Sequence, residues 1–119
     1  MRQKNRETIP PVEVKTGPVK ENIVRGSDVD LYQFPVPKWH FRDGGRYILT
    51  FAGVVTRDPE TGTINMGVYR GMIGQRNTIP ILIVASQHGG QSFTKYKQMN
   101  RSMPVAAVMG YDPITLLSG

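Results

Sequence analysis

The sequence predicts a mainly β domain with a small number of helices, an α+β fold. Its 119 residues suffice for one domain with one modest core. Thirteen glycines and nine prolines indicate many turns and short elements, and segments rich in β-formers recur between them. Hydrophobic residues at 39% and charged residues at 20% favour folding over disorder.

The N-terminal part is polar and repeatedly broken by helix- and strand-breaking residues. We therefore interpret residues 1–22 as an extended arm with at most one short strand, at 12–14, that lies on a neighbouring surface such as that of another chain. Residues 23–119 are expected to form the domain itself. The breakers within the arm are Pro10, Pro11, Gly17 and Pro18.

The first part of the domain is expected to be irregular. Residues 22–25 fit a short strand, and residues 28–31 fit a turn with Ser27 or Asp28 as its local cap. Two prolines exclude residues 34–39 from the centre of a sheet, because each removes a backbone donor. That segment is expected to lay its apolar side chains, Phe34, Val36 and Trp39, on a hydrophobic surface.

A β-hairpin is predicted next. Residues 42–46 form a glycine-rich turn, and residues 47–56 are apolar on both faces, as in a central strand covered on both sides. The Pro-containing turn at 57–62 leads into a returning strand at 63–73.

The remainder is expected to alternate strands and helices. After a turn at 74–77, a third strand covers 79–85, with Pro80 tolerated only near its start. A helix at 92–99, capped by Gln91 or Ser92, follows. A fourth strand lies at 103–110, and a last helix begins at 112–117. Within these helices, Phe93, Tyr96 and Met99 form a stripe expected to face the core, and Asp112 and Pro113 are a cap and a first helical residue.

Composition excludes several classes of site and location. The chain has no cysteine, so disulfides and thiolate chemistry are excluded, and a reducing compartment such as the cytoplasm is expected. No secretory signal is predicted, and the longest apolar run, 79–85, is too short to span a bilayer. The net charge of +6 is spread evenly, which favours a solvated basic surface over a nucleic-acid patch.

Polar groups gather in two short stretches, residues 64–70 and 87–90. The amide of Asn65 and the imidazole of His88 can share one metal ion. The guanidinium of Arg70 can hold a phosphate or carboxylate in a two-pronged contact. A polar turn followed by an ordinary surface histidine explains the same pattern equally well. The other histidine, His40, is interpreted as a structural or surface residue.

Six motifs, in order and with family-like spacing, resemble the UbiD family of reversible decarboxylases from about residue 10 onward. The residues that carry the resemblance are Asp28-Val29-Asp30-Leu31 with Phe34-Pro35-Val36-Pro37, Asp43-Gly44-Gly45-Arg46-Tyr47-Ile48, Asp58-Pro59-Glu60-Thr61-Gly62, Asn65-Met66-Gly67-Val68-Tyr69-Arg70, Ser86-Gln87-His88-Gly89-Gly90, and Met103-Pro104-Val105 through Gly110-Tyr111-Asp112-Pro113.

The resemblance implies a split β-barrel similar to flavin reductases, here incomplete. It implies prenylated FMN with a divalent metal, usually manganese, and often potassium. Asn65 and His88 would be metal ligands, and Arg70 would belong to a Glu-Arg-Glu catalytic network. The cofactor contacts it implies are Asn65, Gly67, Val68, Tyr69, Arg70, Gln87 and His88.

The chain departs from the family in its acidic residues. After Glu60 the only acid is Asp112, which reads as a helix cap. The third metal ligand and the two network glutamates are therefore expected from a missing C-terminal domain or a partner chain, and the chain alone is expected to be inactive. It is interpreted as a fragment or one subunit of a split enzyme.

Three functions are consistent with these features. The first is the cofactor-binding half of a decarboxylase that acts reversibly on an aromatic or α,β-unsaturated carboxylic acid. Loss of carbon dioxide leaves electron density that no side chain here can accept, so that chemistry requires a cofactor. The second is a non-catalytic flavin-phosphate-binding or assembly subunit. The third, less favoured, is a small basic barrel that binds nucleic acid.

Overall fold

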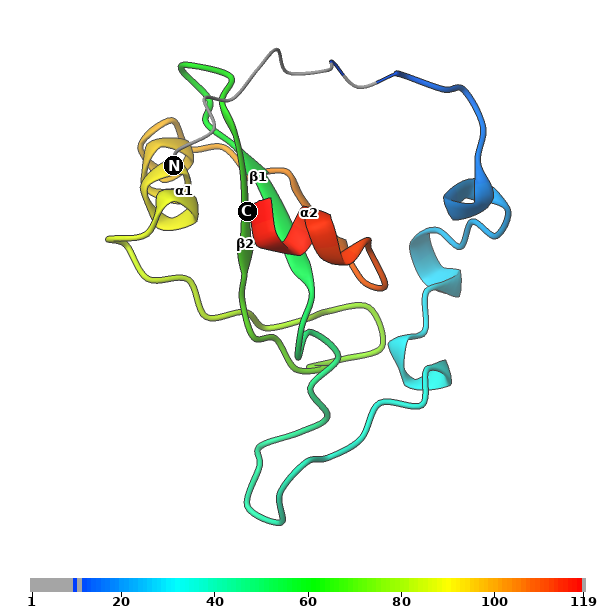
Figure 1. Ribbon diagram of the computed structural model, residues 1–119. Coiled ribbons are helices and arrows are strands. Elements are labelled where there is room, and N and C mark those ends of the chain that lie inside the picture. Colours follow the sequence, from blue (N-terminus) through cyan, green and yellow to red (C-terminus); the bar gives the residue numbers. More distant parts are fainter. Residues whose placement is uncertain (1–9, 11, 119) are drawn as a thin grey trace, which may run out of the picture.

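A three-stranded antiparallel sheet lies at the centre of the computed structural model, which describes residue 10 and residues 12–118 (Figure 1). Its strands are β1 (Gly53–Arg57), β2 (Ile64–Val68) and β3 (Val105–Val108), in the order β2-β1-β3. β1 is thus the central strand, as predicted. The α+β class is confirmed, but the described residues form an open sheet and not a closed barrel.

The predicted hairpin turn joins β1 to β2. The Asp58 N–H donates to the Thr63 carbonyl at 2.9 Å, and the Gly62 N–H donates to the Asp58 carbonyl at 3.0 Å. Gly62 has φ +73°, a left-handed conformation that favours glycine. The turn fixes a register in which Thr56 lies opposite Asn65 and Val54 lies opposite Gly67.

The strand predicted at 47–56 is shorter than expected. Gly53 pairs with Val68, and Leu49 pairs with Gly71 through an isolated bridge. Between these two pairings the first segment has three residues, 50–52, whereas the returning segment has two, 69–70. The first segment therefore carries one extra residue, as in a β-bulge. The extra residue interrupts the ladder, and Phe51 is left exposed. For the same reason β2 ends at Val68, before the predicted 73.

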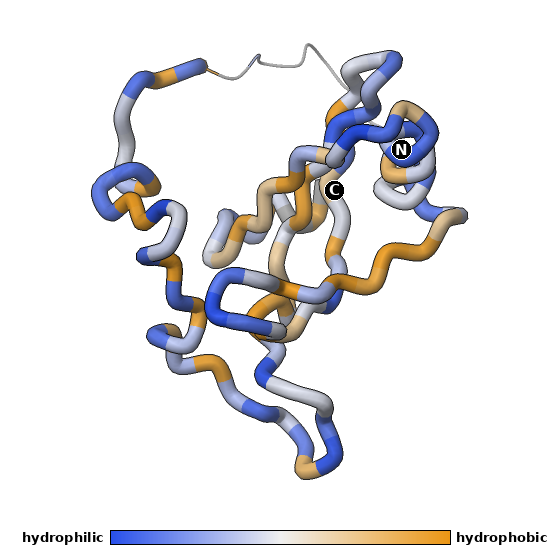
Figure 2. Tube along the Cα trace, turned by 180° about the vertical axis from the view of Figure 1, so that it is seen from behind, coloured by the Kyte–Doolittle hydropathy of each residue, from blue (hydrophilic) through white to orange (hydrophobic). Residues whose placement is uncertain are grey.

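The strand predicted at 79–85 is wrong as a regular strand. Gly71 bridges Ile81, the Met72 N–H donates to the Pro80 carbonyl at 3.2 Å, and the Gly74 N–H donates to the Thr78 carbonyl at 2.9 Å. Pro80 has no N–H with which to return a bond, so the ladder is reduced to a single bridge. The segment leading to the first helix is nevertheless hydrophobic along most of its length (Figure 2).

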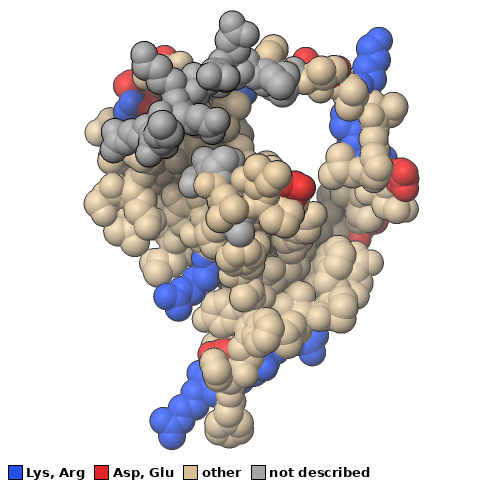
Figure 3. All heavy atoms as spheres, viewed as in Figure 1, with Lys and Arg blue, Asp and Glu red and all other residues tan. Residues whose placement is uncertain are grey.

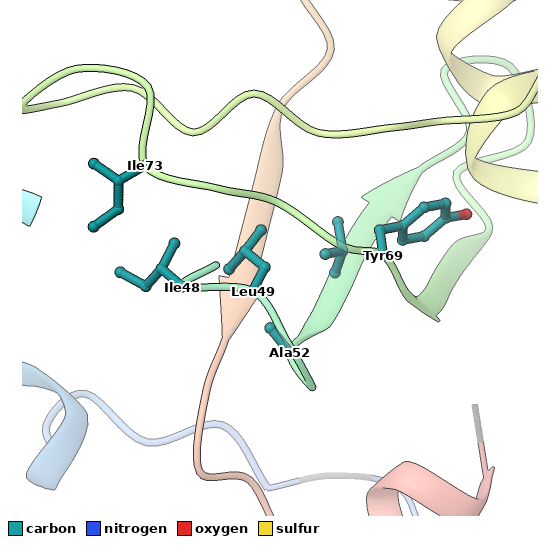
Figure 4. Close-up of a cluster of buried hydrophobic side chains, with 6 residues drawn as sticks. Ile48, Leu49, Ala52, Tyr69 and Ile73 are labelled. Atoms are coloured by element: carbon teal, nitrogen blue, oxygen red, sulfur yellow. The ribbon is translucent and has the colours of Figure 1, made fainter. Parts of the chain in front are cut away.

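The core lies beside the regular sheet, where the irregular parts of the hairpin meet. Its buried side chains come from the 48–54 and 69–73 segments (Figure 4). β3, by contrast, is exposed at all four residues. The buried cluster is Ile48, Leu49, Ala52, Val54, Tyr69 and Ile73, against which Leu31, Val36, Ile79, Ile81 and Ile83 pack.

The first α-helix begins earlier than predicted. α1 (His88–Gln98) starts four residues before the predicted 92, and its N-cap, Gln87, makes no side-chain capping bond. A cap at Gln91 or Ser92 is therefore wrong, because both lie inside the helix. Of the predicted stripe only Tyr96 is buried, while Phe93 and Met99 are exposed.

The last helix forms where the sequence predicts it. α2 (Pro113–Ser118) begins at the predicted proline, and the Ile114 N–H donates to Asp112 Oδ1 at 2.8 Å. This bond is the local capping contact that the sequence order Asp-Pro anticipates.

The N-terminal region has no regular strand among its described residues. Three 3-10 helices occur there, η1 (Pro18–Lys20), η2 (Gly26–Asp28) and η3 (Leu31–Gln33), so the strands predicted at 12–14 and 22–25 are wrong. The local cap is Asp30, which accepts from the Tyr32 N–H at 3.0 Å, and not Ser27 or Asp28. Residues 1–9 and 11 of the predicted arm lie outside the described part of the chain.

This region is attached to the rest of the fold by a few contacts. The Leu31 N–H donates to the Arg76 carbonyl at 2.7 Å, and Arg76 pairs with Asp30 at 3.1 Å. Val36 packs on the core as expected, whereas Phe34 and Trp39 remain exposed. The radius of gyration is 16.6 Å, compared with about 13–14 Å for a compact domain of this length, so the segment runs partly apart from the core (Figure 1).

The backbone of α1 packs closely against the Val84 backbone at Gly90. A Cβ there would overlap the Val84 carbonyl oxygen, and the Val84 carbonyl carbon would be 2.7 Å away. Gly→Ala within a helix ordinarily stabilises by about 1 kcal/mol. Gly90→Ala is instead expected to destabilise by roughly 1–3 kcal/mol through overpacking.

Urea denaturation measures this effect, with Gly17→Ala as the control, because a Cβ at Gly17 meets nothing within 4 Å. Equal stability of the two variants would show that α1 is not seated against Val84.

Candidate functional site

A hollow of about 430 Å³ lies between β2 and the segment that enters α1. It gathers six of the seven side chains or backbone positions predicted for the site, from two stretches that are about twenty residues apart in the sequence. The residues that line it are Asn65, Met66, Gly67, Val68, Tyr69, Ser86, Gln87 and His88.

A second hollow of about 430 Å³ adjoins the first, and Asn65 and His88 line both. The two predicted metal ligands therefore stand at the boundary between the hollows. Within the described part of the chain, neither the Asn65 amide nor the His88 imidazole makes a hydrogen bond, so both are available to a ligand. The second hollow is lined by Asp58, Thr61, Thr63, Ile64, Asn65, His88, Gln91 and Ser92.

Tyr69 joins the two walls of the first hollow. Its ring is buried, and it passes so close to two glycines that neither could carry a side chain. A Cβ at Gly67 would lie 2.8 Å from the ring, and a Cβ at Gly89 would lie 2.6 Å from the tyrosine oxygen. Figure 4 shows the ring pointing away from the aliphatic cluster. The two glycines thus set the separation of β2 and α1.

The first turn of α1 faces the same region. The Gln91 N–H donates to the Gln87 carbonyl at 2.9 Å, which is the first bond of the helix. The N–H groups of the three residues before it, 88–90, have no acceptor among the described residues. Unpaired N–H groups at a helix start attract anions such as phosphate, and the partial positive charge of the helix end adds to that attraction.

Arg70 lies apart from the other six residues. Its side chain lines a hollow of about 270 Å³ with Trp39 and Tyr47, and another of about 450 Å³ with Pro80. The sequence led us to expect it at the mouth of the Asn65 site. Arg70 lies five positions after Asn65, an odd number, and side chains alternate between the faces of an extended segment. The alternation therefore directs Arg70 away from the face that Asn65 shares with Gly67 and Tyr69.

The sequence analysis missed an ion-pair cluster beside the second hollow. Lys95 Nζ lies 2.8 Å from Asp58 Oδ2 and 2.7 Å from Glu60 Oε2. Asp58 Oδ1 also accepts from the N–H groups of Glu60 and Thr61. The cluster fastens the β1–β2 turn to α1, and so fixes Asn65 relative to His88. Two carboxylates in one turn were visible in the sequence, but no spacing rule connects them to a lysine in a later helix.

These contacts shift the ionisation of both partners. The hydrogen bond from Lys95, followed by those from the Thr61 and Glu60 N–H groups, holds the pKa of Asp58 well below its usual value. The hydrogen bonds to Asp58 and then Glu60 raise the pKa of Lys95. Both groups are therefore charged throughout the neutral range.

Two further features bound what the site can do. Among the described residues no group of three or more histidine, aspartate or glutamate side chains is arranged to hold a metal ion. Asn65 and His88 could therefore supply only part of a metal's ligand set. No helix in residues 12–118 is long and apolar enough to cross a membrane.

Comparison with known proteins gives one consistent family. The sequence profile of UbiD, described as the 3-octaprenyl-4-hydroxybenzoate carboxy-lyase Rift-related domain, matches residues 11–119. The pyrrole-2-carboxylic acid decarboxylase of Pseudomonas aeruginosa is 36% identical over 110 residues, which is 92% of this chain and 22% of that protein.

Solved structures agree. An evolved dimeric form of the UbiD-class enzyme HmfF from Pelotomaculum thermopropionicum, in complex with prFMN, has a TM-score of 0.79 and 33% identity, covering 85% of this chain and 23% of that one. The closed form of the vanillic acid decarboxylase of Sedimentibacter hydroxybenzoicus has a TM-score of 0.77 and 31% identity, covering 86% and 22%. This chain therefore spans between a fifth and a quarter of the length of these relatives.

The pH dependence of stability tests the Lys95 cluster. Because the folded pKa of Asp58 is lowered, its stabilisation is complete above the ordinary value of 3.8 and is lost as the pH falls through the lowered value. Because the folded pKa of Lys95 is raised, its share is complete below 10.5 and is lost as the pH rises through the raised value.

Thermal melts should therefore show Lys95→Met less stable than the wild type between these limits, with the difference shrinking toward zero as the pH falls below 3.8. Lys97→Met is the matched control, because Lys97 lies on the same helix without an ion pair among the described residues. A difference between wild type and Lys95→Met that persists unchanged in acid would contradict the assignment.

Proposed function

This chain belongs to the UbiD family, and from that membership we propose that it supplies the prenylated-FMN-binding part of a UbiD-type decarboxylase. The observation that carries the proposal is the hollow that brings Asn65, Tyr69 and His88 together beside the unpaired N–H groups of α1. The relatives named above include decarboxylases of aromatic acids, and one is a complex with prFMN.

The residues present fit the phosphate end of a flavin mononucleotide. The first hollow is lined by Gly67, which carries no side chain of its own, and lies beside the N–H donors at the start of α1. Val68, Tyr69 and Gln87 would contact the cofactor from the same hollow. An amide oxygen and a neutral imidazole suit manganese or a similar divalent ion, and a phosphate oxygen could complete part of its coordination.

When bound, prenylated FMN would supply the electron sink for the electron pair that departing carbon dioxide leaves on the substrate carbon. Arg70 would hold the carboxylate of the substrate, since its guanidinium forms paired hydrogen bonds with a carboxylate. Trp39 and Tyr47 line the same hollow and would offer aromatic surface to an aromatic or α,β-unsaturated acid, in either direction of the reaction. The five residue-to-residue steps from Asn65 to Arg70 span about 16 Å of extended chain, so an elongated cofactor can reach both.

The rest of the proposed enzyme lies outside this chain. Among the described residues no group of three or more histidine, aspartate or glutamate side chains is arranged to hold a metal ion, and no carboxylate is bonded to Arg70. We propose that the remaining part of the protein, or a partner chain, supplies the glutamates, completes the barrel and any potassium site, and contacts the arm at residues 1–22. The assembly would act in the cytoplasm.

The non-catalytic alternative shares the same hollow and differs only in the use of Arg70. The separation of Arg70 from the hollow that Asn65 lines is the observation that keeps this alternative open. A nucleic-acid function has less support, because lysine and arginine side chains stand apart from one another on the face shown in Figure 3.

The two histidines give a matched test of cofactor binding. His88→Ala is expected to weaken manganese-dependent retention of FMN at least about 10-fold, since it removes one of two protein ligands. His40→Ala should leave retention unchanged, because His40 lines a different hollow. Retention is measured as bound flavin and manganese after gel filtration. Equal retention by the two variants would remove the metal assignment.

Arg70 separates the two functions. In the assembly reconstituted with its remaining part, Arg70→Lys keeps the charge and loses the planar fork. Turnover is expected to fall by about 100-fold, roughly the loss of one transition-state contact, while flavin stays bound. Arg101→Lys, an exposed arginine outside these hollows, is the control. Full turnover in Arg70→Lys would favour the non-catalytic alternative for this residue.

A further inference from the structure

The hydroxyl of Thr56 is buried without a hydrogen-bond partner. Thr56 is only 2% exposed, and its Oγ1 is one of two buried side-chain oxygens or nitrogens in the described chain that lack a partner, the other being the Tyr111 hydroxyl. Burying an unpaired hydroxyl costs free energy that valine, of nearly the same shape, would avoid. The neighbours Val54 and Val55 show that valine suits this strand. The hydroxyl therefore needs an explanation other than packing.

The register of the hairpin places this hydroxyl beside the site. Thr56 in β1 is directly opposite Asn65 in β2. Opposite residues in an antiparallel pair project from the same face of the sheet, with Cβ atoms about 4.5–5.5 Å apart. Asn65 lines both hollows, whereas Thr56 lines neither and is buried on the neighbouring strand.

Asn65 needs an orienting partner. The two ends of an amide are almost equal in shape, but one end is an acceptor and the other a donor. A metal ion binds only the oxygen, so an amide turned the other way would present N–H groups to it. No described residue holds the Asn65 amide by a hydrogen bond. An acceptor behind the amide would select the orientation in which Oδ1 faces the hollow.

We propose that Thr56 is a positioning residue for Asn65: rotation of the Asn65 side chain from its position in the structure lets Thr56 Oγ1 accept a hydrogen bond from the Asn65 Nδ2 amino group, which turns Oδ1 toward the ligand held with His88. The inference rests on the proposed function for the ligand, and on the hairpin register for the contact. This bond gives the buried hydroxyl a partner. It also disfavours the orientation of the Asn65 amide that turns Nδ2 toward the metal ion, and a population of that orientation would lower the apparent affinity for the metal.

The test compares three variants of the full 119-residue chain. Thr56→Val removes the hydroxyl and keeps the shape, and Thr56→Ser keeps the hydroxyl. Tyr111→Phe is the control, because it removes the other unpaired hydroxyl. The ring of Tyr111 lies against Gly53, on the face of β1 opposite to the one from which Thr56 projects.

The first measurement is the affinity for Mn²⁺ in the presence of FMN, followed by the paramagnetic signal of free Mn²⁺. Thr56→Val is expected to weaken binding about 10-fold or more, the usual effect of removing a group that orients a metal ligand. Thr56→Ser and Tyr111→Phe should bind as the wild type does. Thermal melts should show only a small change in stability for Thr56→Val, because the loss of one hydrogen bond is offset by the removal of a buried hydroxyl.

The second measurement does not depend on the ligand. The side-chain amide protons of Asn65, followed by NMR, should exchange more slowly with solvent in the wild type and in Thr56→Ser than in Thr56→Val. Wild-type Mn²⁺ affinity in Thr56→Val, or amide protons that do not respond to the substitution, would overturn the inference. If the wild type binds no Mn²⁺, the proposed metal role fails, and the Asn65 amide protons alone decide whether Thr56 positions this side chain.

Discussion

The packing of Tyr69 across two glycines is the contact on which the site depends. Gly67 belongs to β2 and Gly89 to α1, and the buried ring fills the space that side chains at these positions would take. Because a core cannot be compressed, the ring sets the distance between strand and helix. The hollow that carries Asn65 and His88 exists because these two elements are held at that separation and no closer.

An electrostatic contact at the other end of the site complements this packing. Lys95 joins Asp58 and Glu60 of the β1–β2 turn to the last turn of α1, with the Asp58 side chain 17% exposed and that of Lys95 31% exposed. Exposed pairs contribute little on their own, whereas a lysine shared by two carboxylates in a partly shielded position forms a small network. The helix that carries His88 is thus fixed by an apolar contact near its start and a charged contact near its end.

The site divides into two parts with different chemistry. The part around Asn65, His88 and the start of α1 offers oxygen, imidazole and backbone N–H groups, which suit a phosphate and a metal ion. The part around Arg70 offers a guanidinium between aromatic side chains, which suits an organic acid. Neither part is chemically complete in the described residues. This agrees with a chain that spans between a fifth and a quarter of the length of its relatives.

The sequence by itself determined the features that depend on neighbouring residues. The Asp58–Gly62 turn and the Asp112 cap of α2 follow from local hydrogen bonding. The grouping of Asn65, Gly67 and Tyr69 follows from the two-residue period of a strand. Tertiary structure decided the rest. Pro80 has no N–H to donate, and this reduced the expected third strand to a single bridge with Gly71. α1 began at His88 and packed against the Val84 backbone, and both partners of Lys95 came from a distant turn. These outcomes depend on which backbone and side-chain groups meet in space, and that information is absent from any short window of sequence.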